Sequence, residues 1–94
     1  MGERRVVIVN SLGLHARAAA QLVRTAGAYQ SAVRIERADH SASADAKSIL
    51  SVLMLAAARG TQLRVTAEGV DEAVALSAIC ALISSGFGEM IGER

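Results

Sequence analysis

The chain has 94 residues, which is enough for one domain with a modest core, and we treat residues 1–94 as a single domain. Ten basic residues stand against nine acidic ones and only two residues are aromatic, so we expect no nucleic-acid partner and no attraction to an anionic membrane. One cysteine excludes an intrachain disulfide, and no stretch approaches the ~18 apolar residues of a membrane span, so we expect a soluble protein of the reducing cytoplasm.

Four stretches have the pattern of β structure. Residues 4–10 are a β-branched apolar run, which predicts a buried strand. Residues 32–38 and 62–68 alternate apolar with polar side chains, so each predicts a strand with one face toward the core and one toward water. Residues 39–46 are small and polar, and they predict a turn with a short edge strand.

Two stretches have the period of helices that bury one face. Residues 16–26 place an apolar stripe opposite polar and basic side chains, and we expect Gly27 to cap the C-terminus. Residues 71–84 begin with two acidic residues, which suit a helix N-terminus, and they carry an apolar face that includes Cys80. Its apolar neighbours indicate that Cys80 is a small buried side chain rather than a reactive thiolate.

Residues 48–58 predict a third helix, apolar nearly all round and followed by a basic residue and Gly60. Ile49, Leu50 and Leu53 belong to a run of apolar side chains that cannot all face one core, so we expect some of them to be exposed. Exposed apolar side chains here would form a docking surface. A more deeply buried helix or a dimer would explain the same pattern.

The order of elements predicts the fold class. Strand, helix, strand, short strand, helix, strand and helix follow one another along the chain. The simplest arrangement is an α+β domain, in which three helices cover one face of a four-stranded antiparallel sheet and the other face is open to water.

The stretch NSLGLHARAAAQLV, residues 10–23, places His15 where the first helix is expected to start. Backbone N–H groups at a helix start lack intrahelical partners, so they disfavour an imidazolium and offer donors to an anion on the ring. Arg17 adds a planar cation, and Gly13 lets the loop turn sharply. This combination suits a group that accepts and releases phosphate, although a histidine that only caps the helix has the same spacing.

Taken with its neighbours, GLHARAA resembles the active-centre motif GLHARPA of the HPr family of phosphocarrier proteins of bacterial phosphotransferase systems. Three later segments are similar to that family in the same order. They are ADAKSILSVLML in its second helix, AARGTQLRV at the turn into its last strand, and LISSGFGE in its C-terminal tail. The resemblance spans residues 6 to about 89, and it implies the open-faced β-sandwich of that family.

The resemblance implies a role for each residue of the motif. His15 would accept a phosphoryl group on Nδ1 from phosphorylated enzyme I and pass it to a histidine of an enzyme IIA domain. Arg17 and the backbone N–H groups of Ala16 and Arg17 would hold the phosphate oxygens, so the chain would need no cofactor and would turn over no substrate alone. Ala18 departs from the usual proline, a change that we expect to cost about 1 kcal/mol or less.

Ser48 has two candidate roles. A serine at the start of a helix is expected to cap it. The segment AKSIL also resembles the one that holds the regulatory serine of HPr proteins controlled by HPr kinase/phosphorylase, which makes Ser48 a candidate phosphorylation site. In that family the first turns of the second helix meet enzyme I and enzyme IIA, so Ile49, Leu50 and Leu53 are candidate docking residues.

The rival interpretation is an HPr-like regulatory module that acts by binding proteins, although relatives of that kind typically lack the active histidine. Neither His15 nor His40 has a metal-ligand spacing with Cys80 or with a carboxylate cluster, so we predict no metal site. We expect a monomer. The choice between sugar uptake and the nitrogen-related branch stays open.

Overall fold

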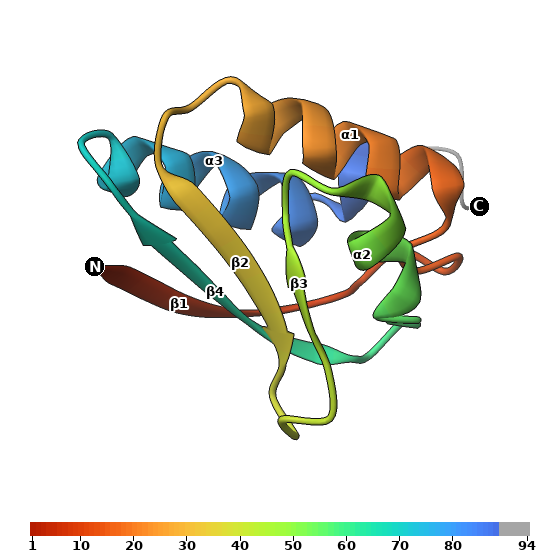
Figure 1. The fold of residues 1–94 in the computed structure, drawn as a ribbon. Helices are drawn as coiled ribbons and strands as arrows, with labels where there is room; N and C mark the ends of the chain where they lie inside the picture. Colours follow the sequence, from red (N-terminus) through yellow and green to blue (C-terminus); the bar gives the residue numbers. More distant parts are fainter. Residues whose placement is uncertain (89–94) are drawn as a thin grey trace.

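The computed structural model describes residues 1–88 and has a four-stranded antiparallel sheet with three helices on one face (Figure 1). The strands lie in the order β1-β4-β2-β3. The elements are β1 (Gly2–Val7), α1 (Ala16–Gly27), β2 (Ala32–Arg37), β3 (Ser43–Asp45), α2 (Ile49–Met54), β4 (Gln62–Glu68), α3 (Glu72–Ser84) and the short 3₁₀ helix η1 (Gly86–Gly88). The predicted α+β class and its element order are confirmed.

The central strands β2 and β4 divide their side chains between the core and water. Ile35 and Val65 are paired across the two strands, and both are fully buried beneath the helices. Gln62 and Glu68, at the two ends of β4, are exposed. The alternation therefore predicts both ends of β4 correctly. The predicted end of β2, residue 38, is one residue too late.

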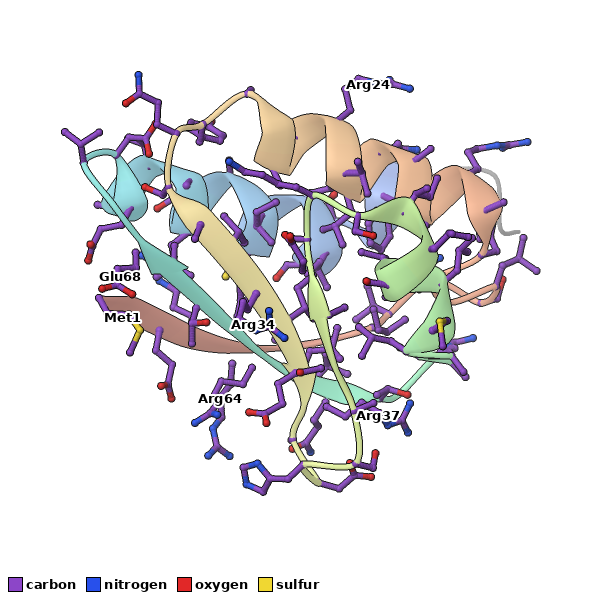
Figure 2. The ribbon with its side chains drawn as sticks, in the orientation of Figure 1. Met1, Arg24, Arg34, Arg37, Arg64 and Glu68 are labelled. Carbon is purple, nitrogen blue, oxygen red and sulfur yellow. The ribbon has the colours of Figure 1, made fainter. Side chains whose placement is uncertain are left out.

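The open face of the sheet carries charged side chains, as the alternation predicts. Arg64 makes a close ion pair with Glu36 and a longer one, 3.7 Å, with Glu3. Figure 2 shows Arg34, Arg64 and Glu68 beside the strands of the sheet. These charges prevent a second apolar layer from covering this face.

The prediction of a buried strand over residues 4–10 is wrong at both ends and in its burial. The strand β1 covers Gly2–Val7, and Val7 is 41% exposed on the open face. Ile8 is buried beyond the end of the strand, where its N–H donates to Thr61 O and its carbonyl accepts from Gly60 N. A β-branched run therefore marks an edge strand here, with one wet face.

The helix α2 is much shorter than the predicted span 48–58. It ends at Met54, because Ala56 adopts a left-handed conformation with a φ of 50°. The carbonyl of the next residue, Ala57, binds outside the helix, because it accepts a hydrogen bond of 2.9 Å from Leu14 N. Non-local hydrogen bonding thus overrides a run with good helix propensity.

The end of α1 differs from the prediction, whereas α3 begins with the two predicted acidic residues. The cap of α1 is Ala28, in the right-handed region, so the cap predicted at Gly27 is one residue too early. The side chain of Asp71 does not cap α3. It accepts 2.9 Å hydrogen bonds from the backbone N–H groups of Gln30 and Ser31, together with one from the Ser31 hydroxyl. The bond from the Ser31 hydroxyl does most to lower the pKa of Asp71.

One continuous core lies between the sheet and the helices. Cys80 is buried in it, as predicted, and burial raises the pKa of its thiol. Phe87 in η1 is also buried, so this part of the predicted tail packs on the core. Glu89, the last residue of the tail motif, lies outside the described residues. Within residues 1–88, the helices are too short or too polar to cross a membrane.

Candidate functional site

His15 is the residue that caps the N-terminus of α1, as predicted. Its backbone is extended, and its carbonyl accepts the hydrogen bond of Ala19 N at 2.8 Å. The ring nitrogen Nδ1 accepts a hydrogen bond from the backbone N–H of Arg17 at 3.2 Å. A nitrogen that accepts a hydrogen bond carries a lone pair rather than a proton, so Nδ1 is the basic nitrogen of this ring and faces the helix start.

A tight turn holds the loop in front of His15. Gly13 N–H donates to Asn10 O at 3.1 Å, and the side-chain amide of the fully buried Asn10 donates back to Gly13 O at 2.9 Å. Gly13 has a φ of 65°, which is costly for any residue with a Cβ. Its freedom to turn is therefore required, as predicted.

Gly13 is also required for a reason that its sequence context does not reveal. A Cβ at this position would lie 2.5 Å from Ala57 O and 2.9 Å from Ala58 Cα, which is too close for either backbone atom. Next to it, the N–H of the buried Leu14 donates to Ala57 O. The loop of residues 10–15, which we call the His15 loop, therefore packs directly on the backbone of Ala57 and Ala58, after α2.

Arg17 and Ala16 lie where the prediction places them, in the exposed first turn of α1. No acidic residue is present in that turn, so no carboxylate of the helix opposes an anion there. Ala18, at the position of the usual proline, is fully buried and continues the helix. The departure from the motif therefore leaves the helix start intact.

The helix α2 lies at the end of the molecule where α1 begins (Figure 1), and it carries exposed apolar side chains. Ile49, Leu50 and Met54 are 41%, 70% and 80% exposed, and we call these three residues the α2 patch. Leu53 is partly buried against the core, so of the predicted docking residues it is the least accessible. The expectation that this apolar run cannot be buried entirely is confirmed.

Ser48 caps α2, because its hydroxyl oxygen accepts a hydrogen bond from Ser51 N at 3.4 Å.

His40 lies apart from this helix, in the turn between β2 and β3, where it is exposed and its Nδ1 is 3.5 Å from Glu36. Among the described residues 1–88, no group of His, Cys, Asp and Glu could hold a metal ion.

Sequence reasoning missed two residues that shape the site. Asn10 could have been found, because an Asn three residues before a Gly is a common turn signal. Ala57 carries no such signal, since its contribution is a backbone carbonyl within a stretch predicted to be helical. Only the folded arrangement brings it to Leu14.

Comparisons with known proteins match nearly the whole chain. A family model described as "PTS HPr component phosphorylation site" matches residues 2–85. Phosphocarrier protein HPr of Cupriavidus necator is 45% identical over 89 residues, which are 95% of this chain and 98% of the relative. Phosphocarrier protein NPr of Proteus mirabilis is 42% identical over 86 residues, 92% of this chain and 94% of the relative. The crystal structure of HPr-C-His from Thermoanaerobacter tengcongensis has a TM-score of 0.88 and 39% identity, and the match covers 95% of this chain and 98% of that one.

Proposed function

We propose that this chain, which belongs to the HPr family of phosphocarrier proteins of the phosphotransferase system, relays a phosphoryl group through His15. The group comes from phosphorylated enzyme I and goes on to an enzyme IIA domain. The observation that carries the proposal is the hydrogen bond between His15 Nδ1 and the Arg17 N–H. It aims the basic nitrogen of the ring at the N-terminus of a helix, which is an anion-binding position.

The transfer step requires little rearrangement at this site. The lone pair of Nδ1 forms the new bond to phosphorus as the bond between phosphorus and enzyme I breaks, and the ring proton stays on Nε2. The Arg17 N–H, which now binds Nδ1 at 3.2 Å, is then close enough to bind a phosphoryl oxygen instead. The N–H of Ala16 and the guanidinium of Arg17 add charge-assisted contacts to the other oxygens.

The α2 patch is the proposed docking surface for enzyme I and for enzyme IIA. It is apolar and exposed, and α2 packs against α1, near the helix start that holds His15, rather than on the charged open face of the sheet (Figure 1). Phosphorylation of Ser48 by HPr kinase/phosphorylase would place a dianion next to this patch. We propose the cytoplasm as the site of action and a monomer as the working form, as expected from the sequence.

The relay is tested by rapid-quench measurement of two steps, from enzyme I to this chain and from this chain to an enzyme IIA domain. We expect Arg17→Ala to slow the transfer about 10- to 100-fold, because a charge-assisted contact to the phosphoryl group is lost. Arg17→Lys should restore part of the rate, since it keeps the charge without the planar fork. Arg24→Ala, which removes an exposed arginine from the other end of α1, is the matched control (Figure 2).

Two results would contradict the proposal. A chain that accepts phosphate but passes none to any enzyme IIA domain is not a carrier. Equal rates for Arg17→Ala and Arg24→Ala would show that the Arg17 guanidinium does not contact the phosphoryl group. Only the backbone N–H groups would then bind it.

A further inference from the structure

The end of α2 holds a strained residue beneath the His15 loop. Ala56 has a φ of 50°, a left-handed conformation that a residue with a Cβ adopts at a cost. Such a residue persists only where its surroundings fix it. The last turn of α2 carries no basic residue of its own to bind the carbonyl groups that the helix end leaves free.

Arg37, from the end of β2, supplies that cation. Its Nη1 donates a hydrogen bond of 3.0 Å to the carbonyl of Leu55 and a longer one of 3.4 Å to the carbonyl of Ala56. Both acceptors lie at the end of α2, so the guanidinium bridges the two peptide units that flank the left-handed turn. Hydrogen bonds from a charged donor are stronger than those between neutral groups.

The backbone of Arg37 is itself well fixed. It pairs with Leu63 in the sheet, and its N–H donates to Ala42 O at 2.9 Å across the hairpin. Side chains of a strand alternate between faces, so Arg37 points to the side of Val33 and Ile35, where the helices lie. Its side chain is only 26% exposed, and Figure 2 shows it beside the lower ends of the strands, near α2.

The segment that Arg37 holds is the one on which the His15 loop rests. The residue after Ala56 is Ala57, whose carbonyl accepts the Leu14 N–H at 2.9 Å. Leu14 directly precedes His15. A change in the left-handed turn would therefore move the acceptor of Leu14 and, with it, the backbone that sets the direction of the imidazole.

We infer that Arg37 is a positioning residue for phosphoryl transfer. It contacts no phosphate; it fixes the exit of α2, and through Ala57 and Leu14 it keeps His15 at the start of α1. The inference rests on the proposed function of His15 for its kinetic consequence, and on contacts within the chain for its structural part.

The test compares Arg37→Met with Arg34→Met. Both remove one arginine of β2 and keep an apolar stem. Arg34 is exposed, however, and its side chain donates to Ser43 Oγ in β3 rather than to the carbonyl groups at the end of α2. In Arg37→Met alone, hydrogen exchange of the Leu14 amide should be faster by about tenfold or more, as the loss of a charge-assisted hydrogen bond allows. The maximal rate of transfer from enzyme I should fall about three- to tenfold, with a smaller change in KM.

Two further variants separate positioning from general destabilisation. Arg37→Lys keeps the charge and one donor, so it should give intermediate exchange and intermediate transfer, and it serves if Arg37→Met does not fold. Ala56→Gly removes the strain that Arg37 offsets, because glycine adopts a positive φ without cost. Added to Arg37→Met, it should restore most of the Leu14 protection and most of the transfer rate.

Leu14 exchange and transfer rates equal to those of Arg34→Met would overturn the inference. Faster exchange with an unchanged transfer rate would also overturn it, because Arg37 would then only stabilise the fold. Exchange is measured on the isolated protein, so it decides whether Arg37 holds the loop even if the wild type accepts no phosphate. That last result would contradict the proposed function instead.

Discussion

Gly13 meets two separate requirements in the His15 loop. Its φ of 65° excludes other residues on conformational grounds, and the backbone of Ala57 and Ala58 excludes them on steric grounds. Gly60, by contrast, has a φ of 90° and nothing within 4 Å of a Cβ. The two glycines therefore separate the conformational requirement from the steric one.

We predict that Gly13→Ala and Gly60→Ala both lose about 1–2 kcal/mol of unfolding free energy for the positive φ. Only Gly13→Ala should lose about 1–3 kcal/mol more, because its methyl group forces the loop away from the end of α2. Urea unfolding of the two variants measures the difference. Equal losses would show that the loop moves away from the backbone of Ala57 and Ala58 at no cost, which would contradict a close contact between them.

At the scale of the element, α2 combines a short helix with an exposed apolar face. Val52 packs on the core while Leu50, two residues earlier, is exposed. A helix of six residues has little intrinsic stability, so it depends on its core contacts and on its ends. The exposed face contributes little to folding and is free to serve binding.

We predict that Leu50→Glu weakens binding to enzyme I by about tenfold or more, since it places a charge in an apolar interface. The melting temperature should change by no more than about 2–4 °C, because Leu50 is on the surface. Val74→Glu makes the same kind of change at an exposed valine of α3, and it is the matched control. Calorimetric titration with enzyme I gives the affinities; equal affinities for the two variants would move the docking surface away from α2.

Ser48 tests what a charge does at the start of the same helix. Ser48→Asp keeps a capping oxygen and adds a negative charge that suits a helix N-terminus, so circular dichroism should show an intact fold. Transfer to His15 should nevertheless slow, because the new charge must be desolvated beside the α2 patch when enzyme I docks. Ser48→Asn introduces a neutral capping side chain of the same size as Asp, so this variant should accept phosphate at the wild-type rate. If the Asp and Asn variants transfer equally fast, Ser48 is a helix cap and no more.

For the whole molecule, the fold could be predicted because its signals are local. The alternation over Gln62–Glu68 places that strand without reference to the rest of the chain. The position of His15 at the start of α1 was predictable for the same reason, since the apolar stripe that follows it marks the helix.

The parts that could not be predicted depend on contacts distant in sequence. Residues 55–58 have the composition of a helix, but Leu14 and Arg37 take their carbonyl groups as hydrogen-bond partners. Arg37 lies 18 residues before Leu55, and nothing in the local pattern joins them. Its inward place in the alternation of β2 was the one available signal, because an arginine on the buried side of a strand needs acceptors there.

The most direct test of the phosphocarrier account is the position of the phosphoryl group after incubation with phosphoenolpyruvate and a cognate enzyme I. Mass spectrometry counts the groups, and nitrogen and phosphorus NMR of the intact protein assigns the bonded atom. The account predicts one phosphoryl group, labile in acid and stable in alkali, on Nδ1 of His15. It should be absent from His15→Ala and unchanged in His40→Ala, in which the other histidine of the chain is removed. Phosphate that persists in His15→Ala, or that is found on His40 or on Nε2, would contradict the account.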